Sequence, residues 1–118
     1  MLRRAALAAL LVLAGACGDD QAADPLVDAH VALCEAADRP DDARQLFFDR
    51  SHEALHEVAR RLDDVDRGQA AALLEAKQKV ESGLDAPGPR LPDDLSRLAD
   101  VYRTSLGRLA IEAPPCDK

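Results

Sequence analysis

The spacing of apolar residues near the C-terminus is the feature that most constrains the fold of this chain. Apolar side chains recur there at intervals of three or four residues: Leu95, Leu98, Ala99, Tyr102, Leu106 and Leu109. This interval matches the 3.6-residue turn of an α-helix and lines up one apolar stripe along one face. The pattern therefore predicts an amphipathic helix, which must bury its stripe against other elements.

Three other segments of the chain also have apolar residues at helical spacing, with breaks between them. We expect helices over about residues 24–37, 41–62, 66–84 and 93–109. The second of these is expected to bury Phe47 and Phe48 on one face, and Asp66 and Gln69 have the spacing of a capping box at the start of the third. Because residues 85–92 contain three prolines and a glycine, we expect that whole segment to lie outside helices.

No segment alternates between apolar and polar residues as a strand would, and no internal repeat is present. Four amphipathic helices joined mostly by short breaks are typical of a helix bundle. The sequence predicts an all-α fold, a small up-and-down four-helix bundle with a folded-back C-terminal tail.

The N-terminus has the layout of a secretory signal. Arg3 and Arg4 precede an apolar run over residues 5–14, and the small residues 14–16 come directly before Cys17. This layout resembles the signal of bacterial lipoproteins. The resemblance implies removal of residues 1–16, lipid on Cys17, a tether over residues 17–23 and a domain over residues 24–118, facing the periplasm or the cell surface. The alternative is ordinary cleavage after Ala16, which would release a soluble secreted protein. The apolar run is too short to span a bilayer.

Two cysteines remain once Cys17 carries lipid. Cys34 lies near the end of the first expected helix, and Cys116 lies in the C-terminal tail. An even pair suits an oxidising compartment, and an extended tail folding back from the last helix is long enough to reach Cys34. We expect a Cys34–Cys116 disulfide. The alternative is that Cys34 is a thiolate ligand of a metal ion.

The acidic charge excludes some classes of partner. The formal net charge is −7, and because the leader holds two basic and no acidic residues, its removal gives −9. Nucleic acid is therefore not an expected partner. With two Phe, one Tyr and no Trp, the chain also lacks aromatic platforms for bases or sugars. An acidic balance is compatible with binding of cations.

Histidines on the second expected helix form the candidate metal site. His52 and His56 are four residues apart, so they share a helix face and can chelate one ion. Asp49 lies on the same flank, and His30 belongs to the neighbouring first helix. Imidazole and carboxylate ligands suit zinc or copper. The alternative is structural, with His52 and His56 as boundary residues and His30 as a hydrogen-bonded core residue.

The segment from His52 to His56 reads H-E-x-x-H, with Glu53 after the first histidine. It resembles the zinc metallopeptidases called zincins, in which the two histidines bind zinc and the glutamate activates water. Glu75 follows at the separation at which one zincin group places its third ligand. The resemblance covers these four positions only, and zincins place this helix beneath a β-sheet that the present sequence does not predict.

Two polar residues fall inside expected apolar stripes. Lys77 lies on the stripe of the third helix and Tyr102 on that of the fourth, and a buried polar group requires a partner. Glu81, one turn from Lys77, is the expected partner. We expect a network of Lys77, Glu81, Tyr102 and His30 that fixes the register of the helices.

Three functions are compatible with these patterns. The first is a lipid-anchored, non-enzymatic protein of the cell envelope that binds a transition metal through His52 and His56. The second is a structural or protein-interaction lipoprotein without a metal. The third is a minimal zinc peptidase. The sequence favours the first function. It also predicts that the protein attaches to a membrane through its lipid.

Overall fold

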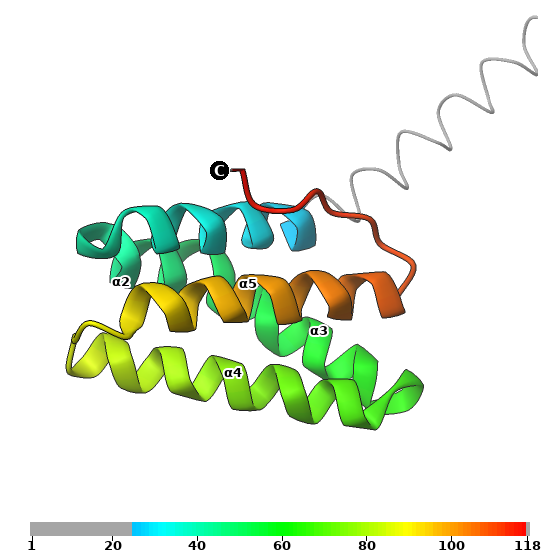
Figure 1. Cartoon of the computed structure of the whole chain (residues 1–118). Coiled ribbons are helices and arrows are strands. Elements are labelled where there is room, and N and C mark those ends of the chain that lie inside the picture. The colour runs from blue at the N-terminus through cyan, green and yellow to red at the C-terminus, as the bar shows by residue number, and fades with distance from the viewer. Residues whose placement is uncertain (1–24, 118) are drawn as a thin grey trace, which may run out of the picture.

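Four helical rods make up the fold in the computed structural model, which describes residues 25–117. Figure 1 shows them with the C-terminal tail returning over the first rod. The first rod is a helix over residues 25–38. The second rod is made of four consecutive segments: η1 (Pro40–Asp42), α2 (Ala43–Leu46), η2 (Phe47–Ser51) and α3 (His52–Val65). The third rod is α4 (Arg67–Asp85) and the fourth is α5 (Leu91–Arg108). No strand occurs over residues 25–117. The prediction of an all-α four-helix fold is confirmed; the expected leader and tether lie outside the described residues.

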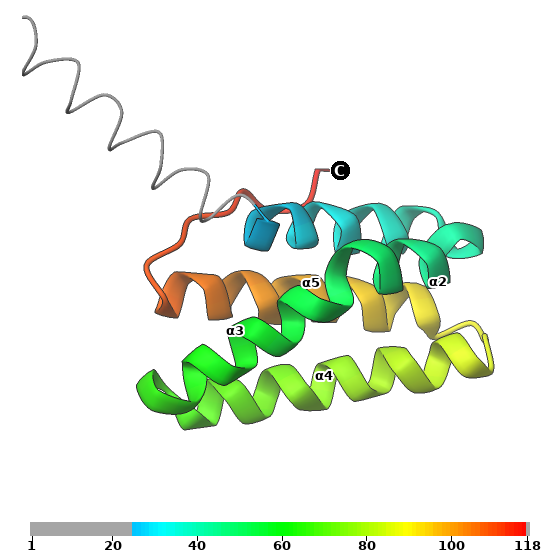
Figure 2. The same ribbon diagram turned by 180° about the vertical axis from the view of Figure 1, so that it is seen from behind.

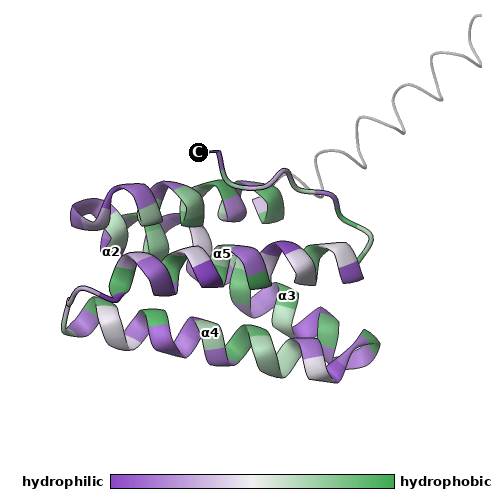
Figure 3. Ribbon diagram, viewed as in Figure 1, coloured by the Kyte–Doolittle hydropathy of each residue, from purple (hydrophilic) through white to green (hydrophobic). Residues whose placement is uncertain are grey.

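The rods stack as an antiparallel bundle. The first helix, α5 and α4 lie one above another, and α3 crosses them on one side, behind α5 in Figure 1 and in front of it in Figure 2. α3 packs against both α4 and α5, and α4 packs along α5. Hydropathy alternates along each helix between the inward and outward faces (Figure 3). The bundle therefore buries one stripe from each rod.

A π-helical turn interrupts the second rod directly before the candidate histidines. A π turn holds more residues than an α turn, so it rotates the faces on its two sides relative to each other. Phe47 and Ser51, four residues apart, are both buried, and the Ser51 hydroxyl donates to the carbonyl oxygen of Ala29 at 3.1 Å. Phe48 is 41 % exposed, so the expectation that it shares the buried face was wrong. The prediction was wrong because it assumed an uninterrupted α-helix.

Helix starts follow local chemistry, with two differences from expectation. The Asp66 carboxylate accepts from the backbone N–H of Gln69 at 3.0 Å, as expected for a cap. The Gln69 amide does not reach back; it donates to Ser105 of α5 at 3.1 Å. α5 begins at Leu91 rather than at residue 93, and Pro92 occupies its first turn. Proline is tolerated there because the first N–H groups of a helix have no intrahelical partner.

The end of α5 directs the tail back toward the first helix. The N–H of Ile111 donates to the carbonyl of Leu106 and that of Ala110 to the carbonyl of Gly107, at 2.9 and 3.0 Å. This pair of bonds is a Schellman motif, and Ala110 takes the left-handed conformation with φ 61°. Arg103 Nε then donates to the carbonyl of Ala113 at 2.7 Å and holds the tail on α5.

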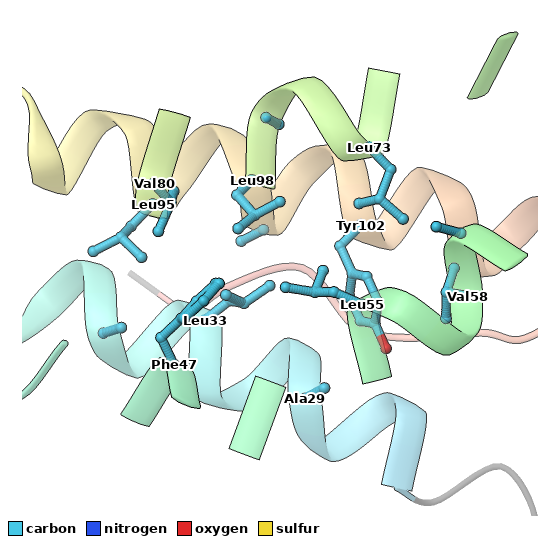
Figure 4. Close-up of a cluster of buried hydrophobic side chains, with 14 of the residues drawn as sticks. Ala29, Leu33, Phe47, Leu55, Val58, Leu73, Val80, Leu95, Leu98 and Tyr102 are labelled. Atoms are coloured by element: carbon cyan, nitrogen blue, oxygen red, sulfur yellow. The ribbon is translucent and has the colours of Figure 1, made fainter. Parts of the chain in front are cut away.

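The core is built from all four rods. Figure 4 shows Leu33, Phe47, Leu55, Leu73, Leu95 and Tyr102 converging from different helices. Each of these side chains is fully buried. The Tyr102 hydroxyl donates to the carbonyl of Leu26 at 2.7 Å, which links α5 to the first helix. The stripe expected on α5 is thus the central seam of the bundle.

Candidate functional site

The His52/His56 pair lies at the start of α3, immediately after the π turn. The centroids of the two imidazole rings are 4.6 Å apart. His52 also contacts the rings of Phe47 and Phe48, with centroids 5.9 and 5.4 Å away, and these contacts limit its rotation. His52 is half-buried and His56 is exposed. One imidazole is therefore held by its surroundings while the other can move in solvent.

α4 brings a carboxylate to this pair. Glu81 Oε2 lies 3.3 Å from His52 Nε2 and accepts a hydrogen bond from Lys77 Nζ at 3.0 Å. The Lys77–Glu81 pairing predicted from the sequence is confirmed. The contact between Glu81 and His52 was missed, although both lie on helices expected to be neighbours. His52, His56 and Glu81 together are called the surface site below.

Charge at the surface site has a defined pattern. Partial desolvation lowers the pKa of His56, and the positive charge of Lys77 and the neighbouring His52 lower it further, while Glu81 opposes them. The lowered pKa favours the uncharged form of His56, in which a ring nitrogen offers a lone pair. Lys77 is nearly buried beside it and repels a cation.

Asp49 and Glu53 lie on another surface. Both are exposed and line a groove with Phe48 and Arg50 in which neither His52 nor His56 takes part. Glu75 is exposed on α4, pairs with Lys79 at 3.9 Å, and lines a further groove beside the loop that leads to α5. The residues of the zincin resemblance, and Asp49, therefore lie on several surfaces and do not form one site.

His30 lies in a different environment, inside the bundle. It is 1 % exposed, and its ring stacks on that of Tyr102 with centroids 6.5 Å apart and an interplanar angle of 14°. Burial lowers the pKa of His30, the charge of Arg103 lowers it further, and Asp100 opposes this. The network expected for His30 and Tyr102 exists as a stack, not as a hydrogen bond between them, and it is separate from the Lys77–Glu81 pair.

Cys34 and Cys116 form the predicted disulfide, with Cα atoms 5.4 Å apart. Both ring nitrogens of His30 lie 3.9 Å from Cys34 Sγ. Within residues 25–117, one group of three His, Cys, Asp or Glu side chains has all its donor atoms within 4.8 Å of one another: His30, Cys34 and Cys116. We call this group the disulfide site. The four-residue spacing of His30 and Cys34 was available in the sequence, but the contribution of the tail required the fold.

A cavity of about 300 Å³ opens beside the disulfide site, between the first helix and the tail. Glu35, Asp38 and Asp117 line it along with the three donor residues. The carboxylates make its mouth negative.

Cys17, the expected lipidation site, lies outside the described residues. Among the helices that the structure describes, none is both long and apolar enough to cross a membrane. Comparisons of the chain with protein-family models, curated protein sequences and solved structures found no match.

Proposed function

We propose that this protein is a non-enzymatic, transition-metal-binding protein of the cell envelope, held on a membrane by lipid on Cys17. The observation that carries the proposal is the surface site, in which two imidazoles from α3 and one carboxylate from α4 meet at the protein surface. Two histidines and a carboxylate are a ligand set that zinc and copper accept.

One pair of donor atoms at the surface site has a separation that suits a shared ion. Two ligands of a tetrahedral zinc ion, each about 2.0 Å from the metal, are roughly 3.3 Å apart. His52 Nε2 and Glu81 Oε2 have this separation, 3.3 Å. The donor atoms of His52, His56 and Glu81 do not all lie within 4.8 Å of one another, so the exposed His56 side chain would have to rotate to bring its nitrogen to the third position, and solvent would supply the fourth ligand. An ion held this way remains accessible to exchange, which suits a buffer, sensor or chaperone of metal ions.

Lys77 affects both the pKa of His56 and the affinity of the surface site for a cation. Its ammonium group is paired with Glu81 and close enough to His56 to lower the pKa of that residue. The same positive charge weakens binding of a cation. Replacement of Lys77 by methionine, which fills similar space without charge, is therefore expected to tighten metal binding.

Isothermal titration of the purified, oxidised chain with Zn²⁺ and Cu²⁺ tests the proposal. We expect one ion per chain at sub-micromolar Kd. Loss of a residue that only hydrogen-bonds to a metal ligand lowers metal affinity by about 10- to 100-fold. The double variant His52→Ala/His56→Ala removes two ligands themselves, so we expect a larger loss of affinity. Glu81→Gln should weaken binding and Lys77→Met should strengthen it.

Glu53→Gln is the matched control, since Glu53 lies on the same turn of α3 but lines another groove. If the surface site only binds metal, Glu53→Gln should leave the metal affinity unchanged. If the protein is a peptidase, Glu53→Gln should abolish activity while metal is retained. Equal, weak binding by wild type and the double variant would overturn the metal proposal and favour a structural or interaction role.

Lipidation has its own test. Growth of the expressing bacterium with labelled palmitate should label the wild-type chain and leave Cys17→Ser unlabelled. Equal labelling of both chains, or labelling of neither, would overturn the anchor.

A further inference from the structure

Three potential metal ligands meet at the disulfide site, which shares no residue with the surface site. His30 and Cys34 lie one turn apart on the first helix, and Cys116 comes from the tail. In the oxidised chain the two sulfur atoms are bonded to each other, so neither is a thiolate. Thiolates are strong ligands for zinc and Cu⁺. The disulfide bond therefore prevents these two sulfurs from acting as thiolate ligands.

The distances around the disulfide are close to those of a metal centre. With zinc–sulfur bonds of about 2.3 Å and zinc–nitrogen bonds of about 2.05 Å, a tetrahedral ion separates sulfur from nitrogen by roughly 3.5 Å and two sulfurs by roughly 3.8 Å. His30 nitrogen and Cys34 sulfur are already 3.9 Å apart. All donor atoms of the group lie within 4.8 Å of one another, and the two sulfurs must separate by about 2 Å when their bond is broken.

Contacts other than the disulfide also hold the tail, up to three residues before Cys116, against α5. The Schellman motif at the end of α5 sets the direction of the tail, and the Arg103–Ala113 hydrogen bond of 2.7 Å fixes it three residues before Cys116. His30 is held by burial and by its stack on Tyr102. The neighbouring cavity, lined by Glu35, Asp38 and Asp117, offers room and negative charge for an entering cation.

We propose that His30, Cys34 and Cys116 form a redox-gated metal site, closed as a disulfide and opened by a dithiol reductant to bind Zn²⁺ or Cu⁺. In the opening step, one thiolate of the reductant attacks a sulfur of the disulfide and forms a mixed disulfide. Its second thiol then displaces the protein sulfur. Two electrons and two protons pass to the protein as two cysteine thiols, and the reductant becomes a disulfide. Metal entry then releases the two thiol protons.

Cobalt(II), an optical substitute for zinc, provides the test. The full chain is reduced with dithiothreitol, freed of reductant by anaerobic gel filtration, and titrated with Co²⁺ and then Zn²⁺. We expect a near-ultraviolet thiolate-to-cobalt absorption band at one ion per chain, which Zn²⁺ abolishes. The oxidised chain should show no such band. Absence of the band in a reduced chain that keeps its helical circular dichroism would overturn the proposal.

Variants assign the ligands. Cys34→Ser and Cys116→Ser are each expected to weaken the band, and His30→Gln is expected to lower affinity by roughly tenfold or more while the thiolate band remains. His52→Ala/His56→Ala is the control and should retain the whole band. A folded His30→Gln chain with unchanged cobalt affinity would overturn the assignment of His30.

Melting of the reduced His52→Ala/His56→Ala chain gives a second measurement, to which the surface site cannot contribute. Because metal binds the folded state, Zn²⁺ should raise its Tm. A reduced chain that unfolds and does not refold with Zn²⁺ would also overturn the proposal. Failure of the surface site is recognised separately, since that site is titrated in the oxidised chain.

Discussion

The two histidine-bearing regions differ in how tightly the fold controls them. At the surface site, His52 and His56 lie at the edge of α3, partly or fully in solvent. At the disulfide site, His30 is 1 % exposed and stacks on Tyr102. Both regions contain two potential ligands four residues apart on one helix. The same local spacing thus yields an open, exchangeable arrangement in one place and a closed, redox-dependent one in the other.

Burial and tertiary contacts account for this difference. The surface site needs one residue from a second helix, Glu81, whereas the disulfide site needs the tail that follows α5. Loss of a surface residue should affect binding and leave the bundle stable. Loss of a residue at the disulfide site should affect the stability of the fold.

The largest effect is expected from removal of the disulfide. Cys34 and Cys116 are 82 residues apart in sequence, and closing a loop of this length stabilises the folded state by about 4 kcal/mol in the chain-entropy description. Urea unfolding of Cys34→Ser/Cys116→Ser against the oxidised wild type measures the loss. An unchanged midpoint would mean that the tail is held by its other contacts alone.

Single histidine replacements give the next largest effect and compare the two regions directly. His30→Ala removes a buried ring and leaves a cavity, so we expect a loss of about 2 to 3 kcal/mol in the free energy of unfolding. His56→Ala removes an exposed ring from a helix and should change stability by less than about 0.5 kcal/mol. Thermal or urea unfolding of the two variants provides the measurement. Similar losses in both would contradict the contrast between the regions.

Two lysine–glutamate pairs on α4 refine the description of the surface site. Side chains of Lys77 and Glu81 are 9 % and 31 % exposed, whereas those of Lys79 and Glu75 are 56 % and 73 % exposed. Glu81→Gln leaves the nearly buried Lys77 ammonium without its anionic partner and should cost about 1 to 2 kcal/mol. Glu75→Gln is the matched control and should cost almost nothing, because exposed pairs contribute little. Equal costs would mean that Lys77 reaches solvent.

The fold was more predictable from the sequence than the sites, for physical reasons. Apolar spacing on α5 predicted its buried face, since helix periodicity and burial are coupled. The π turn and the left-handed Ala110 gave no such signal, because ordinary helix-forming residues occupy both. His52 and His56 were recognisable from local spacing. The contacts of His52 with Glu81 and of His30 with the disulfide join separate elements, so they required the packed bundle.

Apart from the matched controls, the smallest effect is expected for Tyr102, the chain's one tyrosine. Tyr102→Phe removes the hydrogen bond to Leu26 and should cost about 1 kcal/mol. Burial raises the pKa of Tyr102 well above its ordinary value of 10.0. The unfolded chain therefore releases this proton first, so the contribution of Tyr102 to stability is complete below pH 10 and declines as pH rises above it.

Ultraviolet absorbance of tyrosinate reports this ionisation without interference from a second tyrosine. In the native chain the absorbance should rise far above pH 10 and together with loss of helical circular dichroism, whereas in urea it should rise near pH 10. Tyr102→Phe is expected to remove this part of the alkaline instability. Native titration near pH 10 with the helices intact would mean that solvent reaches the phenol, and that His30, stacked against it, is less enclosed than its 1 % exposure indicates.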